Sequence, residues 1–249
     1  MDLIIKNARL LERDGEFDIA IQNGMIAAIE PTVDQAGAEE FDAKGKLVTP
    51  TYVNGHVHHD KSNLGDIMRP NETNSFQECL EITWEHKRTY TTDDIVERAS
   101  RAIREGILNG TTVYRVFADV DTIGGLKPVE GIIALREKWA GIVDIEAVDF
   151  PQEGIIRDPG CKELMREAMV MGADVVGGLP WHEHLDEDAR THIDFCFELA
   201  MEHDKDIHML VDDTDNPNSR SLEYLASKTI RENYQGRVSA SHCGALAAY

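Results

Sequence analysis

From residue 47 onward, the chain alternates short apolar runs with longer segments of helical periodicity. We expect strands at residues 47–55, 111–117, 142–150, 173–176, 206–211 and 237–240, and helices at residues 76–88, 95–109, 128–139, 161–171, 187–203 and 219–234. Strands that alternate with helices require a parallel sheet. Most of these strands end in polar or glycine-rich residues, and no Gly-x-Gly-x-x-Gly follows the first. The pattern therefore predicts an α/β fold with the first six units of a (β/α)8 TIM barrel, rather than a doubly wound sheet.

The N-terminal segment has a different pattern. Short strands are expected at residues 2–11, 17–22 and 25–30, and Asn23-Gly24 is a hairpin signal between the last two. We therefore predict two parts, a small β unit at 1–47 and a barrel at 48–249. Eight units at this spacing would need roughly 270 residues, so we expect an incomplete barrel: either the chain is a fragment, or the missing part comes from elsewhere.

Composition restricts the partners. The formal net charge of −21 disfavours nucleic acid and anionic membranes, which would be repelled. The sequence has neither an apolar run of membrane-spanning length nor a signal peptide. Its four cysteines are scattered, without Cys-x-x-Cys, which is typical of reduced cytoplasmic proteins. A cytoplasmic enzyme for a small neutral or cationic molecule fits these features, and a homo-oligomer stays open.

Two histidines end the first barrel strand. His56 and His58 are two residues apart, and alternate residues of a strand share one face. Two imidazoles aimed at a common point are suitable ligands for a divalent metal. The alternative is a polar strand end, since His-x-His also occurs by chance.

Other chemically active residues also follow strands, where the active sites of such barrels lie. We interpret Asp121, Glu183, His184 and Asp215 as helix caps. Asp213 and His242, together with His56 and His58, are instead candidates for chemistry. Besides His56 and His58, the polar residues on or just after the strands include Asp119, Gln152, His208, Asp212, Asp213, Asp215, Ser239, Ser241 and His242.

Several of these motifs resemble the amidohydrolase superfamily, and within it the cytosine-deaminase-like group. The resemblance runs from about residue 48 to the end of the chain. Its most specific parts are Gly55-His56-Val57-His58-His59-Asp60, Phe150-Pro151-Gln152-Glu153-Gly154, residues 172–180, and Ser239-Ala240-Ser241-His242. The segment Asp60-Lys61-Ser62 is similar to the corresponding segment of relatives that deaminate or dealkylate triazine-type rings. The N-terminal strands resemble the start of the family's small β-sandwich.

The resemblance implies one divalent metal, zinc or iron, held by His56, His58, a further strand-five histidine and a strand-eight aspartate. His242 would hydrogen-bond the metal-bound water, and the acidic residue after strand five, Asp213, would shuttle a proton. Gln152 would hold a carbonyl or nitrogen of the ring. Relatives with two metals use a carboxylated lysine on strand four, and residues 173–178 contain no lysine.

Two departures from the family pattern affect the metal site. Leu210 stands where the strand-five histidine is expected, and His208 lies two residues earlier, about 6.6 Å along a strand. His208 is therefore a tentative ligand. The strand-eight aspartate is not in this sequence.

The resemblance implies hydrolytic removal of an amino or alkylamino group from a nitrogen heterocycle of the cyclic amidine class, such as cytosine. Two alternatives remain open. One is a catalytically incomplete barrel that acts as a binding or assembly subunit, and the other is another cyclic amidohydrolase of the superfamily.

Overall fold

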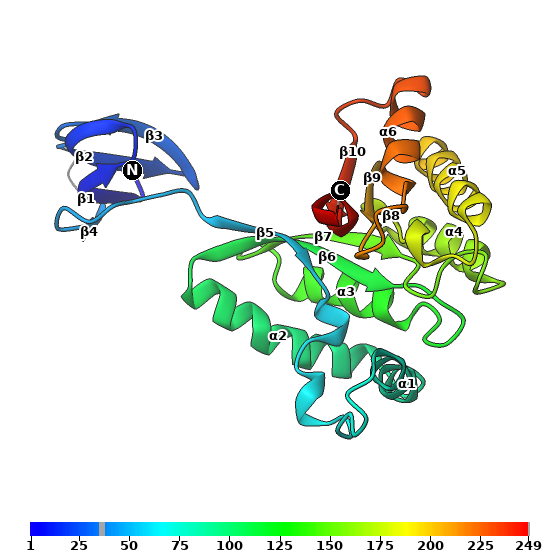
Figure 1. Cartoon of the computed structure of the whole chain (residues 1–249). Helices are drawn as coiled ribbons and strands as arrows, with labels where there is room; N and C mark the ends of the chain where they lie inside the picture. Colours follow the sequence, from blue (N-terminus) through cyan, green and yellow to red (C-terminus); the bar gives the residue numbers. More distant parts are fainter. Residues whose placement is uncertain (35–37, 249) are drawn as a thin grey trace. The chain divides into compact units, whose positions relative to one another are not determined.

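The computed structural model describes residues 1–34 and 38–248. The chain separates into two compact units, Met1–Thr51 and Tyr52–Tyr249. Each unit has its own sheet, so we describe each by itself (Figure 1).

The first unit is a four-stranded sheet in the order β3-β2-β1-β4. Its strands are β1 (Leu3–Leu10), β2 (Arg13–Gln22), β3 (Met25–Glu30) and β4 (Glu39–Asp42). The β2–β3 hairpin turns at Asn23 and Gly24, whose φ angles of 53° and 74° are both positive, as a tight two-residue hairpin requires. Strand β4 pairs in parallel with β1 and was not expected from the sequence. Its exposed, acidic sequence lacks the apolar alternation of a strand.

The second unit contains a six-stranded parallel sheet in the order β5-β6-β7-β8-β9-β10. The strands are β5 (Tyr52–Val57), β6 (Thr111–Asp119), β7 (Asp144–Phe150), β8 (Val175–Gly178), β9 (Asp206–Val211) and β10 (Val238–His242). Chain order equals spatial order, and the sheet curls as half of a barrel (Figure 1). The predicted incomplete TIM barrel is thus confirmed, with six strands among the described residues.

In the described part of the chain six α-helices connect these strands, two of them between β5 and β6: α1 (Phe76–Lys87), α2 (Thr92–Leu108), α3 (Lys127–Lys138), α4 (Cys161–Met171), α5 (Asp186–His203) and α6 (Ser221–Arg231). Helix α2 begins at Thr92, three residues before the predicted start, because Thr91 accepts a hydrogen bond from the Asp94 N–H at 3.2 Å. Its residues Ile95, Ala99 and Ile103 are fully buried at helical spacing. Each helix among residues 1–34 and 38–248 is too short or too polar to cross a lipid bilayer.

Apolar residues divide between the two faces of the sheet. Outward residues of β6 and β7, such as Val116 and Ala147, belong to the large core formed with the helices. Phe117, Phe150 and Leu210 belong to a smaller cluster on the other, inward face. Because successive strand residues alternate faces, the histidines that end β5 lie beside the inward cluster.

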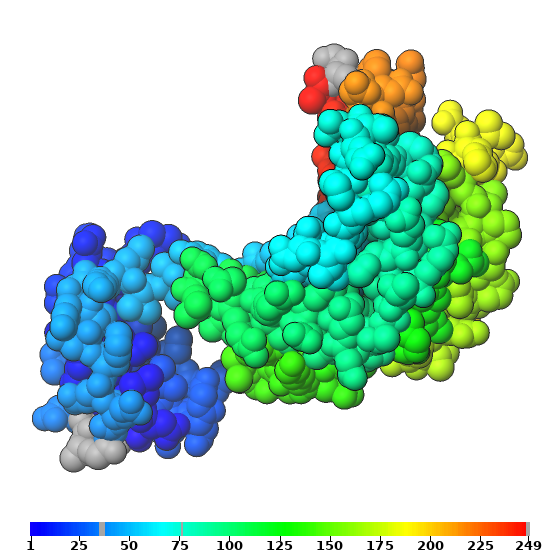
Figure 2. All heavy atoms as spheres, turned by 90° about the horizontal axis from the view of Figure 1, so that it is seen from below, coloured from blue at the N-terminus to red at the C-terminus, as the bar shows by residue number. Residues whose placement is uncertain are grey.

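A long connection separates β5 from α2. It contains two short 3-10 turns, η1 (His59–Lys61) and η2 (Leu64–Asp66), and helix α1. In the space-filling view this segment, coloured cyan to blue-green, covers a large part of the visible surface of the second unit (Figure 2). Only the C-terminal half of α1 contains buried residues, Ile82 and Lys87, among those whose burial is described. The helix is therefore anchored at the end that lies beside the site described next.

Candidate active site

The histidines at the end of β5 converge on one point. The Nε2 atoms of His56 and His58 are 3.2 Å apart. Two nitrogens bound at about 2.0–2.1 Å to one tetrahedral zinc ion lie about 3.3–3.4 Å apart. The spacing of the pair therefore fits two ligands of a single ion.

Their surroundings keep both rings neutral. The rings pack on Phe117, with centroid distances of 4.4 Å for His56 and 5.5 Å for His58. Burial lowers the pKa of His56, and His242 adds to this effect. Burial, with a contribution from Lys61, lowers the pKa of His58 well below its usual value. A neutral imidazole is the form that binds a metal.

The ends of β9 and β10 bring an acid and a histidine to the same place. The His242 ring lies 5.1 Å from the His56 ring, and its Nδ1 is 3.2 Å from Asp213 Oδ2. Both side chains are partly exposed, at 35% and 45%. The structure thus places the two predicted catalytic residues in contact beside the histidine pair.

The neighbouring Asp212 has a different role. Its carboxylate accepts hydrogen bonds from the backbone N–H groups of Ser221 and Leu222, and from the Ser219 and Ser221 hydroxyls. Asp212 therefore caps α6 from the preceding loop. Asp215 makes no hydrogen bond of this kind among the described residues, so Asp212 supplies the cap that we had assigned to Asp215.

Strand β9 directs both His208 and Leu210 to the inward face. Leu210 is 3% exposed and packs with Phe117 and Phe150. The His208 Nδ1 faces the Arg115 guanidinium at 3.4 Å, and its Nε2 hydrogen-bonds the Ser241 hydroxyl at 2.5 Å. Both ring nitrogens of His208 are thus engaged within the protein. Burial and the nearby Arg115 lower its pKa to about 4.

A buried carboxylate, Asp119, lies on the other side of His58. One of its oxygens is 4.0 Å from His58 Nδ1 and 2.6 Å from the Lys61 ammonium, and the other is 2.7 Å from the Lys87 ammonium. Burial alone would raise the pKa of Asp119, but the two lysines outweigh it and hold the pKa below its usual value. Asp60 is also fully buried, and burial together with Asp119 raises its pKa to about 6.

His58, Asp60 and Asp119 could also form a metal site, since one ligand atom from each lies within 4.8 Å of the others. Two ammonium groups already contact Asp119, however, so each of its oxygens has a cationic partner where a metal ion would have to bind. The Nε2 side of the histidine pair therefore fits a metal better. Asp119 lies 4.0 Å from the other ring nitrogen of His58, the side on which a carboxylate often accompanies a metal-binding histidine.

Gln152 lies just beyond β7 and is linked to this cluster. Its Oε1 accepts a hydrogen bond from the Lys61 ammonium at 3.0 Å. The loop that carries Gln152 is held by Glu183, which accepts hydrogen bonds from the N–H groups of Ile155, Ile156 and Arg157. We had expected Glu183 to cap α5, but it instead fixes a preceding loop.

Two other cap interpretations also differ from the structure. Asp121 accepts hydrogen bonds from the Ile123 and Gly124 N–H groups in a turn before α3, and it pairs with Lys87. His184 is exposed, and α5 begins without a side-chain cap. Sequence reasoning missed Lys61 and Lys87 as site residues. Lys61 adjoins the histidine motif and could have been identified as a site residue from that position. Lys87 is the last residue of a polar helix, where a surface lysine is usual.

Comparisons with known proteins add to this geometry. The N-isopropylammelide isopropyl amidohydrolase of Pseudomonas sp. (strain ADP) is 33% identical, over 99% of this chain and 62% of that protein. The 5-methylcytosine deaminase of Klebsiella pneumoniae, solved with 5-fluorocytosine, superimposes with a TM-score of 0.89 at 32% identity, over 99% of this chain and 60% of that one. An atrazine chlorohydrolase of Arthrobacter aurescens, solved with zinc, shares the fold with a TM-score of 0.68 at 13% identity, over 96% of this chain and 60% of that one.

The chain spans about three fifths of the length of the first two relatives. No protein-family model matches the sequence. The relatives are hydrolases and deaminases of nitrogen heterocycles by name, and they share the half-barrel on which the histidine pair is built. These homologues and structural neighbours are amidohydrolase-superfamily proteins, and they match the cytosine-deaminase-like group that the motifs of this chain resemble.

Proposed function

We propose that this chain forms a large part of the active site of a metal-dependent hydrolase that removes an amino or alkylamino group from a nitrogen heterocycle. The observation that carries the proposal is the 3.2 Å convergence of the His56 and His58 Nε2 atoms at the carboxyl end of β5. The names of the two most informative relatives, an isopropylammelide amidohydrolase and a methylcytosine deaminase, support this class of substrate.

The histidine pair would hold one divalent ion, zinc or iron. When bound, such an ion supplies Lewis-acid activation of water near neutral pH. The remaining chemistry belongs to the protein's own side chains, which must bind the ring and move protons.

Asp213 is the proton carrier in this proposal. Its carboxylate would accept a proton from the attacking water and return it to a ring nitrogen or to the departing amine. His242, 3.2 Å from Asp213, would orient the carboxylate towards the histidine pair. Gln152 and Lys61 would contact the polar edge of the ring, because both lie on the Asp119 side of the site. The products would be a ring carbonyl and ammonia or a small amine.

One observation favours the second candidate, a binding or assembly subunit without catalysis. Leu210 is an apolar side chain, buried among Phe117 and Phe150, at the position where the family resemblance implies a metal ligand. A two-histidine site alone binds metal more weakly than a complete ligand set. Metal content and turnover separate the two candidates.

The first test is therefore metal analysis of the purified protein and of a variant that combines His56→Ala with His58→Ala. We expect the parent to contain about one divalent ion per chain, and the variant to lose it. His184→Ala is the matched control, because this histidine is exposed and distant from the pair in the sequence. Equal metal content in parent and double variant would contradict the proposal.

The second test is a screen of aminated and alkylaminated heterocycles for release of ammonia or amine. Turnover that is lost in the double variant supports the hydrolase. Ring binding without turnover, in a protein that contains no metal, supports the binding subunit instead.

A further inference from the structure

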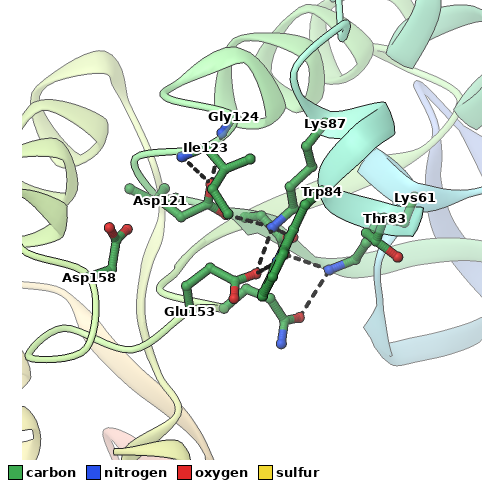
Figure 3. Close-up of polar contacts among 12 residues, drawn as sticks. Lys61, Thr83, Trp84, Lys87, Asp121, Ile123, Gly124, Glu153 and Asp158 are labelled. Carbon is green, nitrogen blue, oxygen red and sulfur yellow. Dashed lines mark hydrogen bonds and ion pairs between the residues drawn. The ribbon is translucent and has the colours of Figure 1, made fainter. Parts of the chain in front are cut away.

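Helix α1 ends in a lysine that is completely buried. The Lys87 side chain has no exposed surface, and its ammonium lies 2.7 Å from Asp119, 2.5 Å from Asp121 and 3.3 Å from Glu153. Figure 3 shows its side chain reaching from the helix between Asp121 and Glu153. Glu153 is itself fixed by the Trp84 indole N–H at 2.8 Å. Such a buried ammonium is tolerated only where several carboxylates surround it.

One of these carboxylates connects Lys87 to the candidate active site. Asp119 divides its two oxygens between two ammonium groups, one oxygen for Lys87 and the other for Lys61. Lys61 in turn donates to Gln152 Oε1 at 3.0 Å. The contacts therefore form a continuous series from Lys87 through Asp119 and Lys61 to Gln152.

The series fixes the orientation of the Gln152 amide. A lysine ammonium only donates hydrogen bonds, so the oxygen of the amide must face Lys61. The amide N–H groups then point away from Lys61 and are available to an acceptor such as a ring carbonyl. A rotation of the amide by 180° would place an N–H group against the ammonium, with no acceptor between them.

Loss of the Lys87 charge would disturb this series at Asp119. The oxygen that now faces Lys87 would remain buried without a cation, close to Asp121 and Glu153. An uncompensated buried carboxylate is costly, so Asp119 would draw the Lys61 ammonium, the other one that contacts it among the described residues. Lys61 would then leave Gln152, and the amide would lose its fixed orientation.

We propose that Lys87 is a positioning residue, which holds Asp119 so that Lys61 keeps the Gln152 amide in one orientation for ring binding. This inference rests on the proposed function, because Gln152 is the residue proposed to bind the ring. The alternative is that Lys87 only anchors α1. The two roles differ in one respect, because an anchor has no effect on the state of the Gln152 side chain.

The test compares Lys87→Met with Lys127→Met. Methionine has nearly the length of lysine without its charge, and Lys127 is an exposed lysine that pairs with Glu130 at the start of α3. The primary measurement is the NMR signal of the Gln152 side-chain NH2 group, assigned by its loss in Gln152→Glu. We expect the signal to shift, or to broaden, in Lys87→Met and to stay unchanged in Lys127→Met. An unchanged Gln152 signal in a folded Lys87→Met protein would overturn the inference.

Kinetics supply the second measurement once a substrate has been found. We expect KM to rise about tenfold in Lys87→Met, with metal content retained and a smaller change in kcat. Gln152→Ala should add little to KM in the Lys87→Met background, because both changes remove the same ring contact. Additive effects of the two substitutions would overturn the inference.

Two further outcomes are distinguishable. If the Gln152 signal responds to Lys87→Met but no heterocycle is hydrolysed, the positioning role is supported while the proposed function fails. If Lys87→Met does not fold, Lys87→Gln retains a donor for Asp119 without the charge. It must change the Gln152 signal in the same way, and an unchanged signal there also counts against the inference.

Discussion

Glu183 offers a quantitative test of how the loop that carries Gln152 is held. Its side chain is fully buried, and its carboxylate accepts three backbone hydrogen bonds, from residues 155, 156 and 157, at 2.6 Å, 3.1 Å and 3.0 Å. It also contacts His192 Nδ1 at 2.7 Å. The Leu179 N–H donates to His192 Nε2 at 3.0 Å, so the ring proton is on Nδ1 and donates to Glu183.

The stability supplied by this carboxylate can be estimated from its pKa. Burial alone would raise the pKa of Glu183, but the hydrogen bonds from His192 and the loop outweigh it and lower the pKa from 4.5 to about 2. One pKa unit corresponds to about 1.4 kcal/mol, which sets an upper limit of roughly 3 kcal/mol on the contribution of the ionised form to folding. Burial lowers the pKa of His192, so this ring is neutral at pH 7 and adds no charge of its own. We expect Glu183→Gln to lower the free energy of unfolding by about 1–3 kcal/mol at pH 7, and the melting temperature by roughly 2–12 °C.

The pH dependence has a definite sign. Because the pKa is lower in the folded state, the contribution is complete above about pH 4.5 and is lost as the pH falls towards 2. The difference between parent and Glu183→Gln should therefore shrink between these values. Urea unfolding at pH 7 and pH 3 measures it, with Glu187→Gln on the exposed first turn of α5 as the control, which should change stability by less than about 0.5 kcal/mol. A loss below about 1 kcal/mol at pH 7, or one that does not shrink in acid, would refute the reasoning.

Asp213 and Asp212 should separate chemistry from stability. Asp213→Asn is expected to reduce kcat by about 10²–10⁴-fold with little change in melting temperature. Asp212→Asn should keep most turnover but lower stability by about 1–2 kcal/mol, because it weakens the cap of α6. Steady-state kinetics and thermal melts of both variants check this, and near-parental turnover in Asp213→Asn would contradict it. Asp149 is fully buried, and its oxygens have no hydrogen-bond partner among the described residues. Burial raises its pKa well above 3.8, so the folded state keeps a proton that the unfolded state releases, and stability should fall as the pH rises above about 4. Asp149→Asn should remove this part of the pH dependence, which urea unfolding at pH 5 and pH 8 measures. An equal loss of stability between pH 5 and pH 8 in parent and variant would contradict this.

Periodicity was sufficient to predict most of the second unit. The helices and strands form where apolar spacing, caps and turn residues agree, as in α2, where Thr91 caps the N-terminus and Ile95, Ala99 and Ile103 form the buried stripe. The predicted helix starts differ from the structure by up to three residues, as in α2, which was expected from residue 95 and begins at Thr92. Helix α6 was expected from residue 219 and begins at Ser221, because Asp212, nine residues earlier, binds its first N–H groups.

The candidate site was only partly predictable, because its members differ in how local their signals are. His56 and His58 share a strand face by simple alternation, and the contact of Asp213 with His242 follows from the pairing of β9 with β10. Lys87 gave no such signal, since its burial depends on three carboxylates that are distant in the sequence. They lie at the end of β6, in the loop after β6 and in the loop after β7. The assignment of Glu183 as a helix cap was wrong for the same reason, because its partners lie 26 to 28 residues away.

The charges behind the histidine pair bear on which ligand the site would take. Among the described residues, the buried cluster there contains four carboxylates, Asp60, Asp119, Asp121 and Glu153, and two ammonium groups, from Lys61 and Lys87. Ionised, the cluster carries two more negative than positive charges, within a region that screens charge poorly. A divalent cation at the Nε2 atoms of His56 and His58 would offset this excess, whereas an anion or a further carboxylate there would increase it. The same charge balance explains why Leu210 need not prevent metal binding: an apolar residue removes a ligand but leaves the field that attracts the cation unchanged.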